Sequence, residues 1–165
     1  MHDSTRRYEE LLATGNPGAG DQLARMTHFV NAAWTLLSSA GVSWIGFYLP
    51  ATTPNELVLG PRRDKPACSP IGLHGACGQS FTQRRTLIVR DVRALGAGYI
   101  ACDPRDQSEL VIPLLHPSGA CGGVLDVDSF DLASFDETDA RSMNLALIAA
   151  GLQAPDRVPA ITVHG

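Results

Sequence analysis

Two apolar runs separated by a short turn stand at residues 108–129, in the sequence SELVIPLLHPSGACGGVLDVDS. The first run is ELVIPLL and the second is CGGVLDVDSF, and the turn HPSGA between them supplies proline and glycine. Apolar runs of this length on either side of such a turn predict an antiparallel β-hairpin. A second hairpin is predicted at residues 42–60, where VSWIGFYL and ELVLG flank the turn PATTPN. Two hairpins indicate a mostly antiparallel sheet.

Two amphipathic helices are predicted outside these hairpins. Residues 21–41 place apolar side chains on one helical face, namely Leu23, Met26, Val30, Ala33, Trp34 and Leu37. Residues 135–154 begin with acids, which the helix dipole favours there, and Asp136 is the expected N-cap. The apolar side of this second helix is expected to carry Met143, Leu145, Ala146, Leu147 and Ala150.

The remaining segments are shorter. We expect an irregular segment or short strand at residues 61–75, a short helix at 75–85 and a strand at 86–92. A long loop is expected at residues 93–108 and a loose tail at 155–165. This order predicts an α+β domain, in which the first and last helices pack on one face of the central sheet and loops lie on the other. We expect the domain at residues 21–153, after an N-terminal extension (1–20) and before a C-terminal tail (154–165).

Composition and charge exclude several function classes. The chain has 165 residues, of which 44% are hydrophobic, and this suits one globular domain. A net charge of -4 without runs of lysine or arginine argues against binding to nucleic acid or to an anionic membrane. No apolar stretch is long enough to span a bilayer, and the N-terminus lacks the apolar core of a signal peptide. We therefore expect a cytoplasmic protein.

The four cysteines, Cys68, Cys77, Cys102 and Cys121, include no C-x-x-C pair, so neither a zinc site nor a thioredoxin-like motif is indicated. Cys102 lies in the long polar loop, where a cysteine is either reactive or inert, and Arg105 nearby could favour its thiolate. Cys77 stands at a predicted helix start, where the dipole favours a thiolate. Cys121 is expected to pack inside the sheet. Four cysteines allow six pairs, and spacing does not choose among them.

Three acids are expected to gather at the first hairpin. Asp126 and Asp128 are two residues apart in a strand, so both side chains lie on one face of the sheet. Hairpin pairing brings Glu109 towards them, and close carboxyls keep a proton near neutral pH more readily. By pattern alone, a solvated sheet face is the commoner interpretation of such a pair. Trp44 and Tyr48 share one face of the other hairpin, where they either line a pocket or fill the core.

Several short motifs resemble a known family. SWIGFYL, LVLGP, KPAC, GACG, IVRDV, YIACD, SELVIPL and GGVLDVDS follow one another in the order seen in free methionine-(R)-sulfoxide reductases, which are GAF-domain enzymes. The similarity runs from about residue 42 to residue 139. It implies a GAF-like fold with a pocket formed by loops on the sheet face opposite the helices. It also implies reduction of free L-methionine-(R)-sulfoxide, with no metal or other cofactor.

The resemblance implies a role for each candidate residue. Cys102 in IACD matches the attacking cysteine, Cys68 in KPAC the cysteine that resolves it as a disulfide, and Cys77 in GACG a third cysteine at the pocket. The substrate-binding residues that it implies are Trp44, Tyr48, Glu109, Asp126 and Asp128. The expected partners are free methionine sulfoxide, thioredoxin or a similar reductant, and a second copy of the chain in a homodimer.

Two departures from the family pattern affect loops. The segment CSPIGLHGAC is one residue shorter than usual, and RALGAGYI before Cys102 is one residue longer. Both put the exact substrate geometry in question more than the reaction. The alternative functions are a non-enzymatic GAF sensor of a small ligand and a thiol-based redox sensor.

Overall fold

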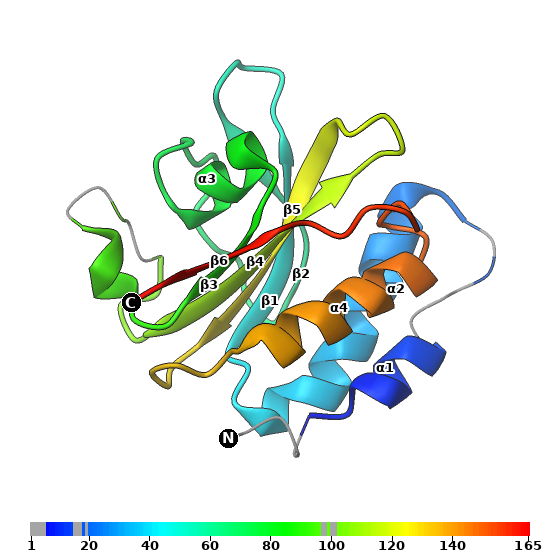
Figure 1. The fold of residues 1–165 in the computed structure, drawn as a ribbon, viewed down its shortest axis with the longest axis horizontal. Coiled ribbons are helices and arrows are strands. Elements are labelled where there is room, and N and C mark those ends of the chain that lie inside the picture. The colour runs from blue at the N-terminus through cyan, green and yellow to red at the C-terminus, as the bar shows by residue number, and fades with distance from the viewer. Residues whose placement is uncertain (1–5, 15–17, 19, 97–98, 100–101) are drawn as a thin grey trace.

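The computed structural model describes residues 6–14, 18, 20–96, 99 and 102–165, and Figure 1 shows how they are arranged. The α-helices are α1 (Tyr8–Thr14), α2 (Gln22–Leu37), α3 (Ala76–Gln83) and α4 (Glu137–Ala149). The strands are β1 (Trp44–Pro50), β2 (Leu57–Arg63), β3 (Thr86–Val89), β4 (Ser108–Leu115), β5 (Cys121–Ser129) and β6 (Ile161–His164). Two 3-10 turns, η2 (Ser38–Ala40) and η3 (Val92–Leu95), follow α2 and β3.

The described strands form one sheet in the order β2-β1-β5-β4-β3-β6. Every neighbouring pair is antiparallel except β3 and β6, which run parallel. Both predicted hairpins are present, as β1–β2 and β4–β5. β5 lies between β1 and β4, so hydrogen bonds to neighbouring strands hold both of its edges.

The helices divide between the two faces of the sheet (Figure 1). α2 and α4 cover one face and α1 packs on them, and the buried core between helices and sheet includes Met26, Phe29, Phe47, Leu125 and Met143. α3 lies on the opposite face, over a smaller apolar cluster. The predicted arrangement, with the first and last long helices on one face, is therefore confirmed.

The two long helices differ from their predictions in detail. Asp136 caps α4 as expected, because its side chain accepts a hydrogen bond from the Asp139 backbone N–H at 3.0 Å. Leu23 and Leu145 are wrong as core positions, since 56% and 55% of each side chain is exposed. Leu23 stands in the first turn of α2 and Leu145 on the solvent side of α4, so neither reaches the sheet.

The predicted N-terminal extension contains a helix that the sequence analysis did not anticipate. Residues 1–5, 15–17 and 19 lie outside the described part, but α1 packs on α4 and buries Leu11 completely. Arg6 donates a hydrogen bond to Asp139 Oδ1 at 2.9 Å, and Tyr8 donates to the same oxygen at 2.6 Å. Both charged side chains of the Arg6–Asp139 pair are inaccessible to solvent. This ion pair fixes the start of α1 against α4.

The prediction of a loose C-terminal tail is wrong. Residues 161–164 form β6, which pairs in parallel with β3 from Thr86↔Ile161 to Val89↔His164. Arg85 Nε also donates to Thr162 Oγ1 at 2.7 Å. The tail is ordered because β6 pairs with the outer edge of β3, which its other neighbour β4 leaves open. A single sequence gives no signal for such distant pairing.

No helix in the described part of the chain combines the length and the apolar character that crossing a membrane requires.

Candidate active site

A cavity of about 280 Å³ lies on the sheet face opposite α2 and α4. Its walls come from β1, β4 and β5, from the first turn of α3, and from the segments that precede α3 and β4. All eight site residues predicted from the sequence line it, namely Trp44, Tyr48, Cys68, Cys77, Cys102, Glu109, Asp126 and Asp128. The fold therefore brings together residues that are up to 84 positions apart, from Trp44 to Asp128, in one small cavity.

The floor of the cavity consists of the three acids. Alternation along β5 turns Asp126 and Asp128 to the cavity, while Leu125 and Val127 enter the helix-side core. On β4, Glu109 pairs with Asp128, so the register of the hairpin places a third carboxyl beside the two on β5. Only 4% of Glu109 and 6% of Asp126 is exposed, so the interpretation as a solvated sheet face is wrong.

Burial and mutual repulsion control the protonation of these acids. Burial is the main cause that raises the pKa of Asp126, and the charges of Asp128 and Glu109 raise it further. Burial also raises the pKa of Asp128 and of Glu109. The described residues that line the cavity include no lysine or arginine to oppose these effects. The cluster therefore holds a proton to higher pH than isolated carboxyls do, and a protonated carboxyl is a hydrogen-bond donor.

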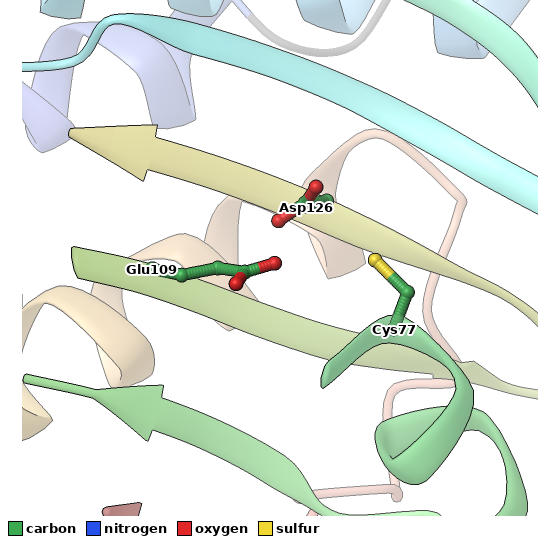
Figure 2. Close-up of side chains that lie close together, drawn as sticks. All are labelled: Cys77, Glu109 and Asp126. Atoms are coloured by element: carbon green, nitrogen blue, oxygen red, sulfur yellow. The ribbon is translucent and has the colours of Figure 1, made fainter. Parts of the chain in front are cut away.

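Cys77 lies directly against this floor (Figure 2). Its sulfur, one oxygen of Glu109 and one oxygen of Asp126 lie within 4.8 Å of one another. Burial raises the pKa of the Cys77 thiol, and the neighbouring acids raise it further. The expected thiolate at the helix start is therefore wrong for this structure, because desolvation and negative charge outweigh the dipole of a short helix.

Cys68 and Cys102 form a disulfide at the rim of the cavity, with their Cα atoms 5.7 Å apart. Cys68 comes from the segment between β2 and α3, and Cys102 from the loop before β4. The bond confirms the pairing that the family resemblance implied. Arg105 lies elsewhere than expected, because it pairs with Asp103 at 2.8 Å and stacks over the ring of Phe130.

The two aromatic residues hold the segment that carries Cys68. Trp44 Nε1 donates to the backbone oxygen of Lys65 at 2.7 Å, and the Tyr48 hydroxyl donates to the backbone oxygen of Cys68 at 2.8 Å. Their rings lie 6.2 Å apart on the same strand face. Trp44 and Tyr48 therefore meet both predicted alternatives, because they line the pocket and also belong to the smaller buried apolar cluster. They also position a cysteine.

Sequence reasoning missed two further polar residues of the cavity. The Tyr99 hydroxyl donates to Glu109 Oε2 at 3.2 Å, and burial raises the pKa of Tyr99. Asp106 accepts a hydrogen bond from Ser43 Oγ at 3.0 Å, and burial raises its pKa to about 6. Both flank Cys102 in the sequence, so proximity to the predicted nucleophile was the available signal. The residues 97, 98, 100 and 101 of the lengthened loop lie outside the described part.

Comparison with known proteins gives evidence for the fold and the family of this chain. No protein-family model matches the sequence. The chain is 41% identical over 145 residues to GAF domain-containing protein A of Dictyostelium discoideum, covering 86% of this chain and 88% of that protein. It is 36% identical over 138 residues to free methionine-R-sulfoxide reductase of Saccharomyces cerevisiae, covering 79% and 76%. The structure of the Neisseria meningitidis free methionine-R-sulfoxide reductase in complex with its substrate matches with a TM-score of 0.77 and 37% identity, covering 87% and 86%.

These matches confirm two predictions made from the sequence. The sheet and the helices form a GAF fold, which solved GAF domains share. The named reductases match over most of their own length. The chain therefore belongs to the free methionine-R-sulfoxide reductase family.

Proposed function

We propose that this protein reduces free L-methionine-(R)-sulfoxide to methionine. The observation that carries the proposal is the Cys68–Cys102 disulfide at the rim of a cavity with a buried carboxyl floor. Reductases with this name resemble the chain at 36% identity, and the substrate complex from Neisseria meningitidis has the same fold. The disulfide is the product expected at the end of one catalytic cycle.

The first step is attack of the Cys102 thiolate on the sulfur of the sulfoxide. A carboxyl of the floor donates a proton to the sulfoxide oxygen, which weakens the sulfur–oxygen bond. The raised pKa values of Glu109, Asp126 and Asp128 support this role, because they favour a protonated carboxyl within the cluster. The bond that the attack forms between Cys102 and the substrate sulfur then breaks as the oxygen passes to Cys102, which leaves Cys102 as a sulfenic acid and releases methionine.

The second step forms the observed disulfide. The Cys68 thiol attacks the Cys102 sulfenic sulfur, the new S–S bond forms, and the oxygen leaves as water. Two electrons have then passed from the two thiols to the sulfoxide. An external dithiol must return them, and thioredoxin is the proposed donor. Because this cycle requires a reducing environment, we place the protein in the cytoplasm.

Substrate binding follows from the walls of the cavity. The ionised members of the floor attract the substrate ammonium, and the amides that begin α3 near Cys77 attract its carboxylate. Trp44 and Tyr48 face the apolar part of the substrate. The predicted homodimer stays a prediction.

A coupled assay tests this proposal. Thioredoxin, its reductase and NADPH are mixed with the protein and free L-methionine-(R)-sulfoxide, with the S epimer as the stereochemical control. We expect NADPH consumption with the R epimer alone, and a loss of about a thousandfold or more in Cys102→Ser, because that variant lacks the nucleophile. No turnover by folded, reduced protein would contradict the proposal and favour a GAF sensor or a thiol redox sensor.

A further inference from the structure

An ion pair joins the two segments that carry the redox cysteines. Lys65 stands three residues before Cys68. Asp103 directly follows Cys102, and its Oδ2 accepts a hydrogen bond from Lys65 Nζ at 2.6 Å. We propose that this ion pair positions the two cysteines in the reduced enzyme, so that the resolving thiol reaches the sulfenic acid before other reagents do. This role rests on the proposed function, and it concerns the second step of that reaction alone.

The Lys65 end of the pair is fixed to the sheet. The backbone oxygen of Lys65 accepts a hydrogen bond from Trp44 Nε1 at 2.7 Å, and Trp44 is a buried residue of β1. The Tyr48 hydroxyl fixes the same segment again, because it donates to the backbone oxygen of Cys68 at 2.8 Å. Neither contact involves the disulfide, so this segment keeps its place on β1 when the two cysteines are reduced.

The Asp103 end of the pair is ordered by its own turn. Asp103 Oδ1 accepts a hydrogen bond from the Arg105 backbone N–H at 3.0 Å, and the Asp103 backbone oxygen accepts one from the Asp106 N–H at 3.1 Å. Asp106 is buried and accepts a hydrogen bond from Ser43 Oγ at 3.0 Å, which ties the turn to the residue before β1. Only 14% of the Asp103 side chain is exposed, so its carboxylate stays oriented towards Lys65.

The ion pair matters because few polar contacts join these segments. Among the hydrogen bonds and ion pairs of the described residues, it is the one that links residues 64–70 to residues 102–107. Both redox cysteines are exposed and stand outside the regular strands, so reduction of the disulfide leaves them without a covalent link. A partly exposed ion pair contributes little to the free energy of unfolding. Its effect is expected on a rate instead, because holding two reacting groups together raises their effective concentration.

A purely electrostatic role for Lys65 predicts a different pattern. An ammonium group favours a nearby thiolate on Cys68, and a neighbouring carboxylate opposes it. Under that role Asp103→Asn speeds disulfide formation, since the variant loses a negative charge and keeps Lys65. If the pair acts by position, Asp103→Asn and Lys65→Met both slow disulfide formation, because each removes one half of the contact.

The test measures how the Cys102 sulfenic acid divides between Cys68 and an added trap. Reduced protein receives L-methionine-(R)-sulfoxide in the presence of dimedone, and mass spectrometry gives the ratio of dimedone adduct on Cys102 to disulfide. This ratio reports the second step alone, because it does not depend on how fast the sulfenic acid forms. We expect it to rise by about tenfold in Lys65→Met and in Asp103→Asn. Methionine release in a single turnover should stay within about twofold of the wild type.

Three further variants make the result specific. Arg105→Met is the matched control, because it removes the other side chain that pairs with Asp103 and leaves Lys65 in place, so its ratio should stay within about twofold of the wild type. Lys65→Arg keeps a cation that can reach the carboxylate, and its ratio should lie closer to the wild type than to Lys65→Met. The double variant Lys65→Met/Asp103→Asn should not exceed either single variant by more than about twofold. Circular dichroism checks that each variant is folded.

Hydrogen peroxide replaces the sulfoxide in a second arm of the test. It oxidises the Cys102 thiolate to the sulfenic acid and is itself reduced to water, after which the same division between Cys68 and dimedone is measured. This arm reports positioning even if the protein does not reduce the sulfoxide, so failure of the proposed function and failure of the ion pair are distinguishable. An unchanged ratio in Lys65→Met, a lower ratio in Asp103→Asn, or equal slowing of methionine release and disulfide formation overturns the positioning role.

Discussion

Cys68 and Cys102 form a disulfide, whereas Cys77 is a buried thiol and Cys121 donates a hydrogen bond to the backbone oxygen of Gly123. The resolving role proposed for Cys68 differs from the attacking role because it acts only after the oxygen has been transferred. In Cys68→Ser we therefore expect one methionine per protein in a single turnover, but multiple turnover with thioredoxin reduced by about tenfold or more. The sulfenic acid on Cys102 should be trapped by dimedone and detected by mass spectrometry.

Cys121→Ser is the matched control for that experiment. Its sulfur lies outside the cavity, so single and multiple turnover should both stay at the wild-type level. Equal multiple turnover in Cys68→Ser and in the wild type would show that another thiol resolves Cys102.

Asp106 and Asp103, three residues apart, should respond to pH in opposite ways. Burial raises the pKa of Asp106 to about 6 from 3.8. Protonated Asp106 therefore favours the folded state at low pH, and this contribution to the free energy of unfolding is lost as the pH rises through about 6. Asp106→Asn keeps a neutral group, and its free energy of unfolding should exceed that of the wild type by about 1–3 kcal/mol at pH 7 and by little at pH 4. Urea unfolding at the two pH values measures this difference.

The contribution of Asp103 to the free energy of unfolding should depend on pH in the opposite direction. Arg105 and Lys65 hold the pKa of this carboxyl well below its usual range, so its contribution to stability is present above about pH 4 and is lost as the pH falls further. Asp103→Asn should therefore be less stable than the wild type at pH 7, with a deficit that shrinks in acid. A gain at pH 7 in Asp103→Asn, or a loss in Asp106→Asn, would contradict these assignments.

At the scale of elements, α3 depends on one close contact with the segment before it. A Cβ atom at Gly78 would overlap the backbone of Leu73, whereas one at Gly75 would meet no atom within 4 Å. Gly78→Ala should push α3 away from the sheet, lower the free energy of unfolding by about 1–3 kcal/mol and reduce turnover, because Cys77 precedes it. Gly75→Ala is the control and should cost less than about 1 kcal/mol.

The elements also show where sequence reasoning succeeds. The hairpin pattern predicted β4 and β5, and alternation then fixed Asp126, Asp128 and Glu109 on one face. Both steps work because neighbouring strands in the chain pair locally. β6 escaped prediction because its partner β3 is 75 residues away by the register Thr86↔Ile161, and no local pattern encodes such a pairing.

The site residues that belong to sequence motifs could be predicted, whereas the properties that depend on three-dimensional packing could not. The pairing of Cys68 with Cys102 came from the family resemblance, since spacing alone left six choices. The raised pKa of Cys77 was missed because its cause is three-dimensional: burial and acids from two strands outweigh the local helix start. Tyr99 was missed for a similar reason, because its role depends on a hydrogen bond to Glu109 across the cavity.

At the scale of the whole molecule, the disulfide joins two connections that are 34 residues apart. Closing a loop of this length restricts the unfolded chain and contributes about 3–4 kcal/mol. Reduction should lower the free energy of unfolding by about that amount, measured by urea unfolding with and without a dithiol. A Cys68→Ser protein should show no such response, and equal stability of the two wild-type forms would contradict the estimate.

The position of β5 between β1 and β4 has a consequence for how this enzyme can diversify. Hydrogen bonds on both edges hold the strand that carries Asp126 and Asp128, whereas both disulfide cysteines stand in connections outside the regular strands. Insertions and deletions can accumulate in those connections while the acids keep their places. Laboratory evolution towards bulkier sulfoxides should therefore begin with randomised lengths of the two connections, leaving the central strands unchanged.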